Sequence, residues 1–304
     1  MKHLLWVIVV YALAATSVLA QEEWPTLTGP FLGQPLPGPT PQKFASGVIS
    51  TDEGYELNAV FSPDQRIFMF TREIDGVAKM HYSFRNGEGV WSAPRLASPS
   101  LTYPHHADVD MAFAPEGQRL YFISKRPLEG HALETYNLWY SDRSPEGLHS
   151  PVALGPRING PGHEFYPWIV GDGSLYFTAE RPDSIGSFDS YRAQFRDGRF
   201  DAPVHLGAAI NSEHREGDIF VNADESILVH VSTGRPDSLG DGDLYISFRQ
   251  EDGAWGQDRH LGDGINSPEF DFCPVITPDG EYFFFSRAGD LYWMEAATLE
   301  RYRD

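Results

Sequence analysis

The stretch Asp271-Phe-Cys-Pro-Val-Ile-Thr-Pro-Asp279 decides the fold, because four other segments repeat its pattern. Each begins with an acid, continues through mostly apolar residues and ends at an acidic turn. The five segments are Glu56–Asp64, Asp108–Glu116, Glu164–Asp172, Glu216–Asp224 and Asp271–Asp279. Their first residues are spaced by 52, 56, 52 and 55 positions. That period is near the length of one four-stranded propeller blade.

Each repeat predicts four strands. The quoted segment is strand A, and turns such as Glu116-Gly117 and Asp279-Gly280 indicate a hairpin to strand B. Strands B and C are aromatic and β-branched, and a short strand D follows a Trp, Leu or Phe. The sequence therefore predicts an all-β, five-bladed β-propeller of four-stranded antiparallel blades.

The fifth repeat lacks its strand D, since the chain stops at Asp304. The pattern of a strand D and the residues that follow it occurs near the N-terminus, where Pro41–Phe44 is followed by Ile49-Ser50. We expect this N-terminal segment to be the outer strand of the last blade. Such closure removes an exposed sheet edge.

The chain divides into three parts. Lys2, an apolar run and the small residues before Gln21 predict a signal peptide over residues 1–20, with an uncleaved N-terminal anchor as the alternative. Residues 21–40 are rich in Pro and Gly and predict an extended arm over the surface. Residues 41–304 form the propeller. We expect a periplasmic or secreted protein with no membrane span after cleavage.

Composition restricts the partners. With 43 acidic and 23 basic residues the net charge is −20, which disfavours nucleic acid and anionic membranes. A protein or carbohydrate ligand is expected, and the chain is expected to be a monomer. The one cysteine, Cys273, cannot form an internal disulfide and lies in an apolar strand, so we expect a buried thiol.

Several short motifs carry a family resemblance. The Ser-Pro-Asp turn at residues 62–64, the Arg after strand B and the Asp-Leu-Tyr of strand C occur with a Trp-x-x-Pro-x-x-Leu-like strand D. Together these resemble the TolB-type (WD-like) propeller repeats of secreted bacterial proteins, from about Phe44 to Met294. The resemblance implies the fold. It leaves function open, because such propellers include binding scaffolds and polysaccharide-degrading enzymes.

An acid begins each strand A and an arginine follows each strand B. Antiparallel pairing places the two opposite each other, and Arg bonds a carboxylate in bidentate fashion. We expect one structural ion pair per blade: Glu56–Arg72, Asp108–Arg126, Glu164–Arg181, Glu216–Arg235 and Asp271–Arg287.

The same end of the ring offers binding candidates. They comprise histidines before the acids, the acids themselves and residues two positions later: His106, Asp108, Asp110, His163, Glu164, Tyr166, His214, Glu216 and Asp218. His106, His163 and His214 beside carboxylates would suit a divalent metal. The alternative is that these histidines are solvated loop residues. No cofactor is otherwise indicated.

Blade two alone carries a longer insert, Pro127–Asn137, with His131 and Glu134, which favours specific recognition there. Tyr55, Tyr103, Tyr166 and Trp168 at the same rim could stack on sugar rings, although core packing is the better explanation of Trp168. No catalytic motif nominates a nucleophile or acid. The leading hypothesis is a protein- or glycan-binding scaffold acting through the channel rim. The alternative is a carbohydrate-active enzyme, a glycoside hydrolase or polysaccharide lyase, with its site at the same rim.

Overall fold

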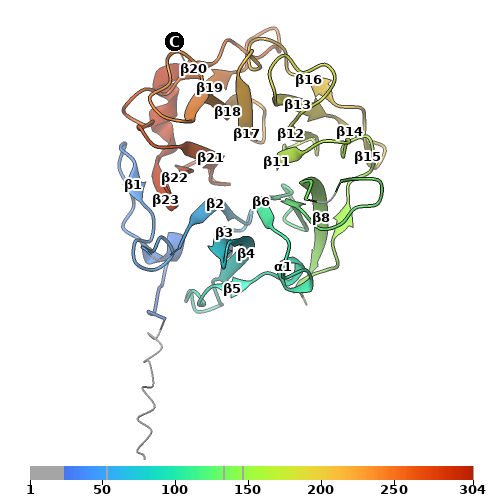
Figure 1. The fold of residues 1–304 in the computed structure, drawn as a ribbon. Coiled ribbons are helices and arrows are strands. Elements are labelled where there is room, and N and C mark those ends of the chain that lie inside the picture. The colour runs from blue at the N-terminus through green and yellow to red at the C-terminus, as the bar shows by residue number, and fades with distance from the viewer. Residues whose placement is uncertain (1–23, 53, 133, 146, 304) are drawn as a thin grey trace, which may run out of the picture.

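The computed structural model describes residues 24–52, 54–132, 134–145 and 147–303. It shows five antiparallel sheets arranged as blades around a central axis (Figure 1). The predicted five-bladed propeller is confirmed. The predicted signal peptide lies outside the described residues.

The inner two strands of each blade form the A–B hairpins. The A strands are β2 (Glu56–Phe61), β6 (Asp108–Phe113), β11 (Glu164–Ile169), β17 (Arg215–Val221) and β21 (Asp271–Ile276). The B strands are β3 (Ile67–Ile74), β7 (Arg119–Ser124), β12 (Leu175–Ala179), β18 (Ile227–Thr233) and β22 (Tyr282–Arg287). Figure 1 shows the A strands lining the centre of the ring.

The outermost strand of each blade, strand D, is much shorter than strand C. The C strands are β4 (Val77–Phe84), β8 (Asn137–Ser144), β13 (Asp189–Ala193), β19 (Asp243–Phe248) and β23 (Asp290–Glu295). The D strands are only two residues long: β5 (Arg95–Leu96), β10 (Val152–Ala153), β16 (Val204–His205), β20 (Arg259–His260) and β1 (Gln42–Lys43). A further strand, β9 (Gly147–Leu148), pairs with β8, and β14 (Phe195–Arg196) forms a hairpin with β15 (Arg199–Phe200).

The ring closes as predicted. Strand β1 pairs antiparallel with β23, so Gln42 lies opposite Trp293. Phe44, the next residue after β1, is fully buried and its ring centroid lies 5.0 Å from that of Phe284 and 5.4 Å from that of Phe68. The N-terminal segment thereby completes blade five and packs against blade one.

The segment before β1 bridges the same two blades. Trp91 of blade one donates through Nε1 to the carbonyl of Gly29 at 2.7 Å, and Gly38 accepts from the amide of Glu295 in blade five. The short 3-10 helix η1 (Phe31–Gly33) buries Phe31 and Leu32. Part of the predicted surface arm is therefore packed into the ring.

The other helices are short. They are α1 (Ser98–Thr102) and the 3-10 helix η2 (Ala296–Tyr302). Among the described residues, no helix combines the length and apolarity that a membrane crossing requires.

The ring has two ends, which we call the loop face and the turn face. At the loop face, crossovers from the preceding blade enter the A strands and loops join the B and C strands. At the turn face lie the A–B turns near Asp64, Glu116, Asp172, Asp224 and Asp279.

Candidate functional site

In four blades, the acid that begins strand A contacts the arginine that follows strand B, as predicted, at the loop face. The closest N–O distances are 2.7 Å for Arg72–Glu56, 2.7 Å for Arg126–Asp108, 3.3 Å for Arg235–Glu216 and 2.6 Å for Arg287–Asp271. All four carboxylates are fully buried. They cannot contact a ligand without a rearrangement of the loops above them.

The arginines also hold the crossovers that enter their own blades. Each donates to a crossover carbonyl, that of Ile49, Pro99, Ile158, Ile210 or Ile265. The following crossover residue bonds the backbone of strand C in the preceding blade. These contacts join Ser50 to Leu291, Ser100 to Met80, Asn159 to Leu138, Asn211 to Ser190 and Asn266 to Leu244. We call each such arrangement a blade joint, because it ties two neighbouring blades together.

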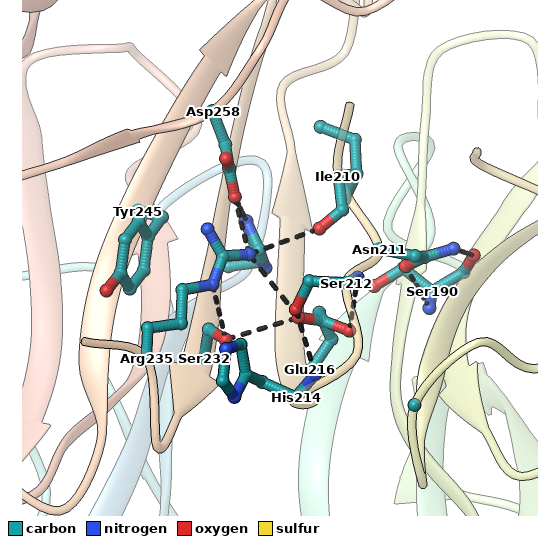
Figure 2. A network of polar contacts seen from close by, with 12 residues as sticks. Ser190, Ile210, Asn211, Ser212, His214, Glu216, Ser232, Arg235, Tyr245 and Asp258 are labelled. Carbon is teal, nitrogen blue, oxygen red and sulfur yellow. Dashed lines mark hydrogen bonds and ion pairs between the residues drawn. The ribbon is translucent and has the colours of Figure 1, made fainter. Parts of the chain in front are cut away.

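Figure 2 shows the joint before blade four. Arg235 lies between Ile210, Glu216 and Asp258, and its Nη2 is 2.7 Å from the Asp258 carboxylate. Burial raises the pKa of Asp258, but hydrogen bonds and charges from His230 and Arg235 outweigh it and lower this pKa to about 2. The Asp258 carboxylate is therefore charged and structural at neutral pH.

Glu164 departs from this pattern. Its Oε1 accepts from the amide of Gly160 at 2.7 Å, but its buried Oε2 has no partner among the described residues. Arg181 donates to the carbonyl of Ile158, as the other four arginines do to their crossover carbonyls, but its buried Nε is unpartnered. Burial raises the pKa of Glu164 to about 8. The predicted Glu164–Arg181 ion pair is therefore absent, and Glu164 retains a proton near neutral pH.

The crossover sequence before Glu164 also differs from those of blades four and five. In blade four the Ser212 hydroxyl donates to Glu216 at 2.6 Å, and in blade five the Ser267 hydroxyl donates to Asp271 at 2.9 Å. Gly160 occupies the corresponding position before Glu164 and offers no hydroxyl. This glycine was the sequence signal that could have identified Glu164.

The residues two positions after each acid fill the channel instead of forming its rim. Asn58, Asp110, Tyr166, Asp218 and Cys273 occupy five equivalent β-bulges, each with φ between 24° and 55°. The Tyr166 hydroxyl donates across the ring to the carbonyl of Pro274 at 3.0 Å and accepts from Asn58 Nδ2 at 3.4 Å. The channel is therefore bridged by a side chain at this level.

Two of these channel residues, Asp110 and Asp218, carry carboxyl groups. Burial raises the pKa of Asp110, and the neighbouring Asp218 raises it further. Burial also raises the pKa of Asp218, although the backbone amide of Cys273 donates to it at 3.0 Å. Cys273 is buried, and burial raises the pKa of its thiol. Burial thus shifts the pKa of each of these three groups toward the protonated form.

The three histidines proposed as metal ligands have separate surroundings. His106 uses its carbonyl to accept from Lys79, His163 accepts from the amide of Tyr136 through Nδ1 at 3.1 Å, and His214 lies beside Gly234. Within the described ranges, no group of three or more His, Cys, Asp or Glu side chains is arranged to hold a metal ion. The structure does not bring these imidazoles together.

The loop face instead exposes apolar side chains from every blade. Six of the eleven large exposed hydrophobic residues lie there. They are Tyr55, Leu101, Tyr103, Ile185, Leu239 and Phe270, with exposed fractions from 37% to 59%. Isolated exposed apolar residues are ordinary, whereas a contiguous apolar patch marks an interaction site. The blade-two insert adjoins this face, where Lys125 and Glu134 pair at 3.5 Å.

A cavity of about 710 Å³ opens at the centre of the turn face, opposite the predicted rim. Its walls come from the ends of all five A strands and include Phe61, Phe113, Trp168, Phe220 and Val275. Sequence reasoning missed this cavity. Its signal was an aromatic or aliphatic residue at the end of each strand A, followed in three blades by a proline at the turn.

Comparisons with known proteins concern the fold. No family model matches the chain. No curated protein matches it significantly in sequence.

Solved structures include similar rings. TolB from Acinetobacter baumannii is 13% identical with a TM-score of 0.50, over 81% of this chain and 55% of that chain. A TolB candidate from Agrobacterium tumefaciens is 18% identical, with a TM-score of 0.49 over 76% and 73%. A gluconolactonase from Xanthomonas campestris is 11% identical, with a TM-score of 0.47 over 88% and 97%. At these identities the likeness extends to the β-propeller architecture alone.

Proposed function

We propose that this chain is an exported binding propeller whose loop face docks a protein partner. The observation that carries the proposal is the set of exposed apolar side chains contributed to that face by all five blades. Interfaces of this kind use apolar anchors set on loops that a rigid scaffold holds in place.

The make-up of the face favours a protein over a glycan. Three of the six exposed side chains, Leu101, Ile185 and Leu239, are branched aliphatics, which do not stack on a sugar as the aromatic rings of the other three can. Such side chains pack into the apolar pockets of a partner protein. The net charge of −20 further favours a partner with a basic surface, because opposite charges steer association.

The polar residues at this end support a binding role over a catalytic one. Glu56, Asp108, Glu216 and Asp271 are each engaged in a blade joint, and all are buried. Glu56, Glu216 and Asp271 also accept from crossover amides, and Asp108 accepts from the Ser100 hydroxyl, so these acids hold the loops in place. This arrangement suits a rigid support for the loop face.

The experiment is a binding screen of the mature chain against a displayed library of protein domains and against a glycan array. Substitution of Ile185→Asp with Leu239→Asp should reduce binding of the selected partner at least tenfold. The matched control is Val152→Asp with Val204→Asp, which alters exposed apolar residues of the outer strands. Equal loss in both variants, or hits on glycans alone, would contradict the proposal.

One observation favours the alternative, a carbohydrate-active enzyme. Glu164 holds a proton near neutral pH, as a general acid for glycoside cleavage must. However, only 1% of Glu164 is exposed, so the loops above it would have to open for a substrate. A polysaccharide turnover screen tests this function. Activity lost in Glu164→Gln, with the fold retained, would favour the enzyme over the scaffold.

A further inference from the structure

The central cavity of the turn face has apolar walls and an acidic margin. Phe61, Phe113, Trp168 and Phe220 provide aromatic surface, and the rings of Trp168 and Phe220 meet edge to face at 4.7 Å. Trp168 is partly exposed to the cavity, while most of its neighbours on the walls are buried. A cavity of about 710 Å³ lies within the range of sites that hold drug-sized ligands.

Charge at the margin has one sign. The lining residues include Asp224, Asp279, Glu281 and Glu300, and none of the described residues that line the cavity is Lys, Arg or His. Hydrogen bonds hold the Asp279 carboxylate in its turn. It accepts from the Thr277 hydroxyl at 2.6 Å and from the Gln65 side-chain amide at 2.6 Å. These hydrogen bonds outweigh the effect of burial and lower the pKa of Asp279, so its carboxylate is charged at neutral pH. Asp224 and Glu281 are exposed on the same margin.

We infer that this cavity binds a small apolar organic cation, with its apolar body against the aromatic walls and its positive group at the carboxylates. An aromatic face attracts a cation, and Trp is the strongest of the natural side chains in this respect. A carboxylate ligand would face repulsion from the margin, and a neutral ligand would leave the charges unused. The site is at the opposite end of the channel from the loop face and is independent of the function proposed there.

The test uses three fluorescent probes with the intact mature chain: cationic thioflavin T, neutral N-phenyl-1-naphthylamine and anionic 1-anilinonaphthalene-8-sulfonate. We expect saturable binding of thioflavin T, weaker binding of the neutral probe and the weakest binding of the anion. High salt should weaken the cation most, because salt screens exposed charges.

Two variants locate the charge effect. Asp224→Asn with Glu281→Gln should weaken thioflavin T at least fivefold and leave the neutral probe unchanged. The matched control, Asp241→Asn with Glu269→Gln, makes the same change in net charge among exposed loop-face residues and should leave the cation affinity unchanged. Trp168→Leu should weaken the cation and alter the spectrum of the bound probe, with a thermal melt to verify folding.

The outcomes decide the inference without reference to the partner of the loop face. Equal losses in the margin and control variants would indicate general electrostatic attraction and overturn the site. Equal binding of the anionic and cationic probes, or no saturable binding of the cation, would overturn it as well. Retained partner binding in the margin variant would show that the two faces act separately.

Discussion

Glu164 and Glu216 occupy equivalent positions yet have different surroundings. Glu216 accepts from the Ser212 and Ser232 hydroxyls and contacts Arg235, whereas Glu164 has a single donor, the amide of Gly160. A buried carboxylate with so few donors is costly, and protonation is the cheaper state. One glycine in a crossover thus changes the chemistry of an otherwise repeated acid.

The first prediction concerns the pH dependence of this residue. The folded-state pKa of Glu164 is about 8, against 4.5 for an unperturbed Glu, so the folded state binds the proton more tightly. Its contribution to stability is present below about pH 4.5 and is lost as the pH rises to about 8. Glu164→Gln mimics the protonated form, and its free energy of unfolding at pH 8 should exceed that of the parent by about 4 kcal/mol, since each pKa unit corresponds to about 1.4 kcal/mol.

Urea unfolding of both proteins between pH 5 and 8 measures this difference, which should grow with pH. Two variants serve as comparisons. Gly160→Ser supplies a hydroxyl beside Oε1 and should reduce the pH dependence, while Glu216→Gln breaks an ion pair and should destabilise the protein. A pH-independent difference for Glu164→Gln would contradict the assignment.

At the residue scale, sequence spacing could predict that the acid of each strand A faces the arginine after strand B, because antiparallel pairing alone determines which residues lie opposite one another. It could not predict that Arg181 would miss Glu164, since all five arginines reach a crossover carbonyl and the other four also contact their acid. Sequence spacing also could not predict that Ser50, Asn159 and their counterparts accept from the backbone of strand C, because that strand belongs to the preceding blade.

At the scale of elements, strand A deviates from simple alternation. A bulge in every A strand places a non-glycine residue at positive φ, from 24° at Asp218 to 55° at Asn58 and Asp110. Simple alternation along a strand predicts that these side chains lie on the same side as the acid. The bulge turns them into the channel, where Tyr166 and Asn58 meet.

The second prediction concerns the closing strand. Strand β1 makes two residue pairs with β23, so the buried ring of Phe44 must supply much of the stability of closure. Phe44→Ala should lower the free energy of unfolding by about 3 to 5 kcal/mol, as expected for a buried Phe. Phe84→Ala, at a ring that is 37% exposed, should cost about 1 kcal/mol or less. Denaturant titration distinguishes the two, and similar costs would show that Phe44 does not hold the closure.

At the scale of the whole molecule, the repeat predicted the number of blades and the closure, because both depend on periodicity along the chain. The exposed apolar side chains of the loop face and the turn-face cavity were harder to predict from the sequence. The turn-face cavity forms where five A strands from distant parts of the sequence converge, and only their arrangement in space shows that Phe61, Trp168 and Phe220 share one wall.

The last prediction concerns cooperativity of the ring. Open repeat arrays can unfold in parts, but here every blade boundary has a joint, including the one between blades five and one. Loss of one joint should therefore weaken the whole ring. Asn211→Ala removes the partner of the buried backbone of Ser190 and should cost about 1 to 3 kcal/mol.

Each blade contains one tryptophan, so fluorescence samples all of them: Trp91, Trp139, Trp168, Trp255 and Trp293. Fluorescence and far-ultraviolet circular dichroism should give coincident transitions in the parent, in Asn211→Ala and in Ser50→Ala, with both variants shifted to lower denaturant. Separated transitions in either variant would mean that blades unfold independently, and that the joints position neighbouring loops without coupling the stability of the ring.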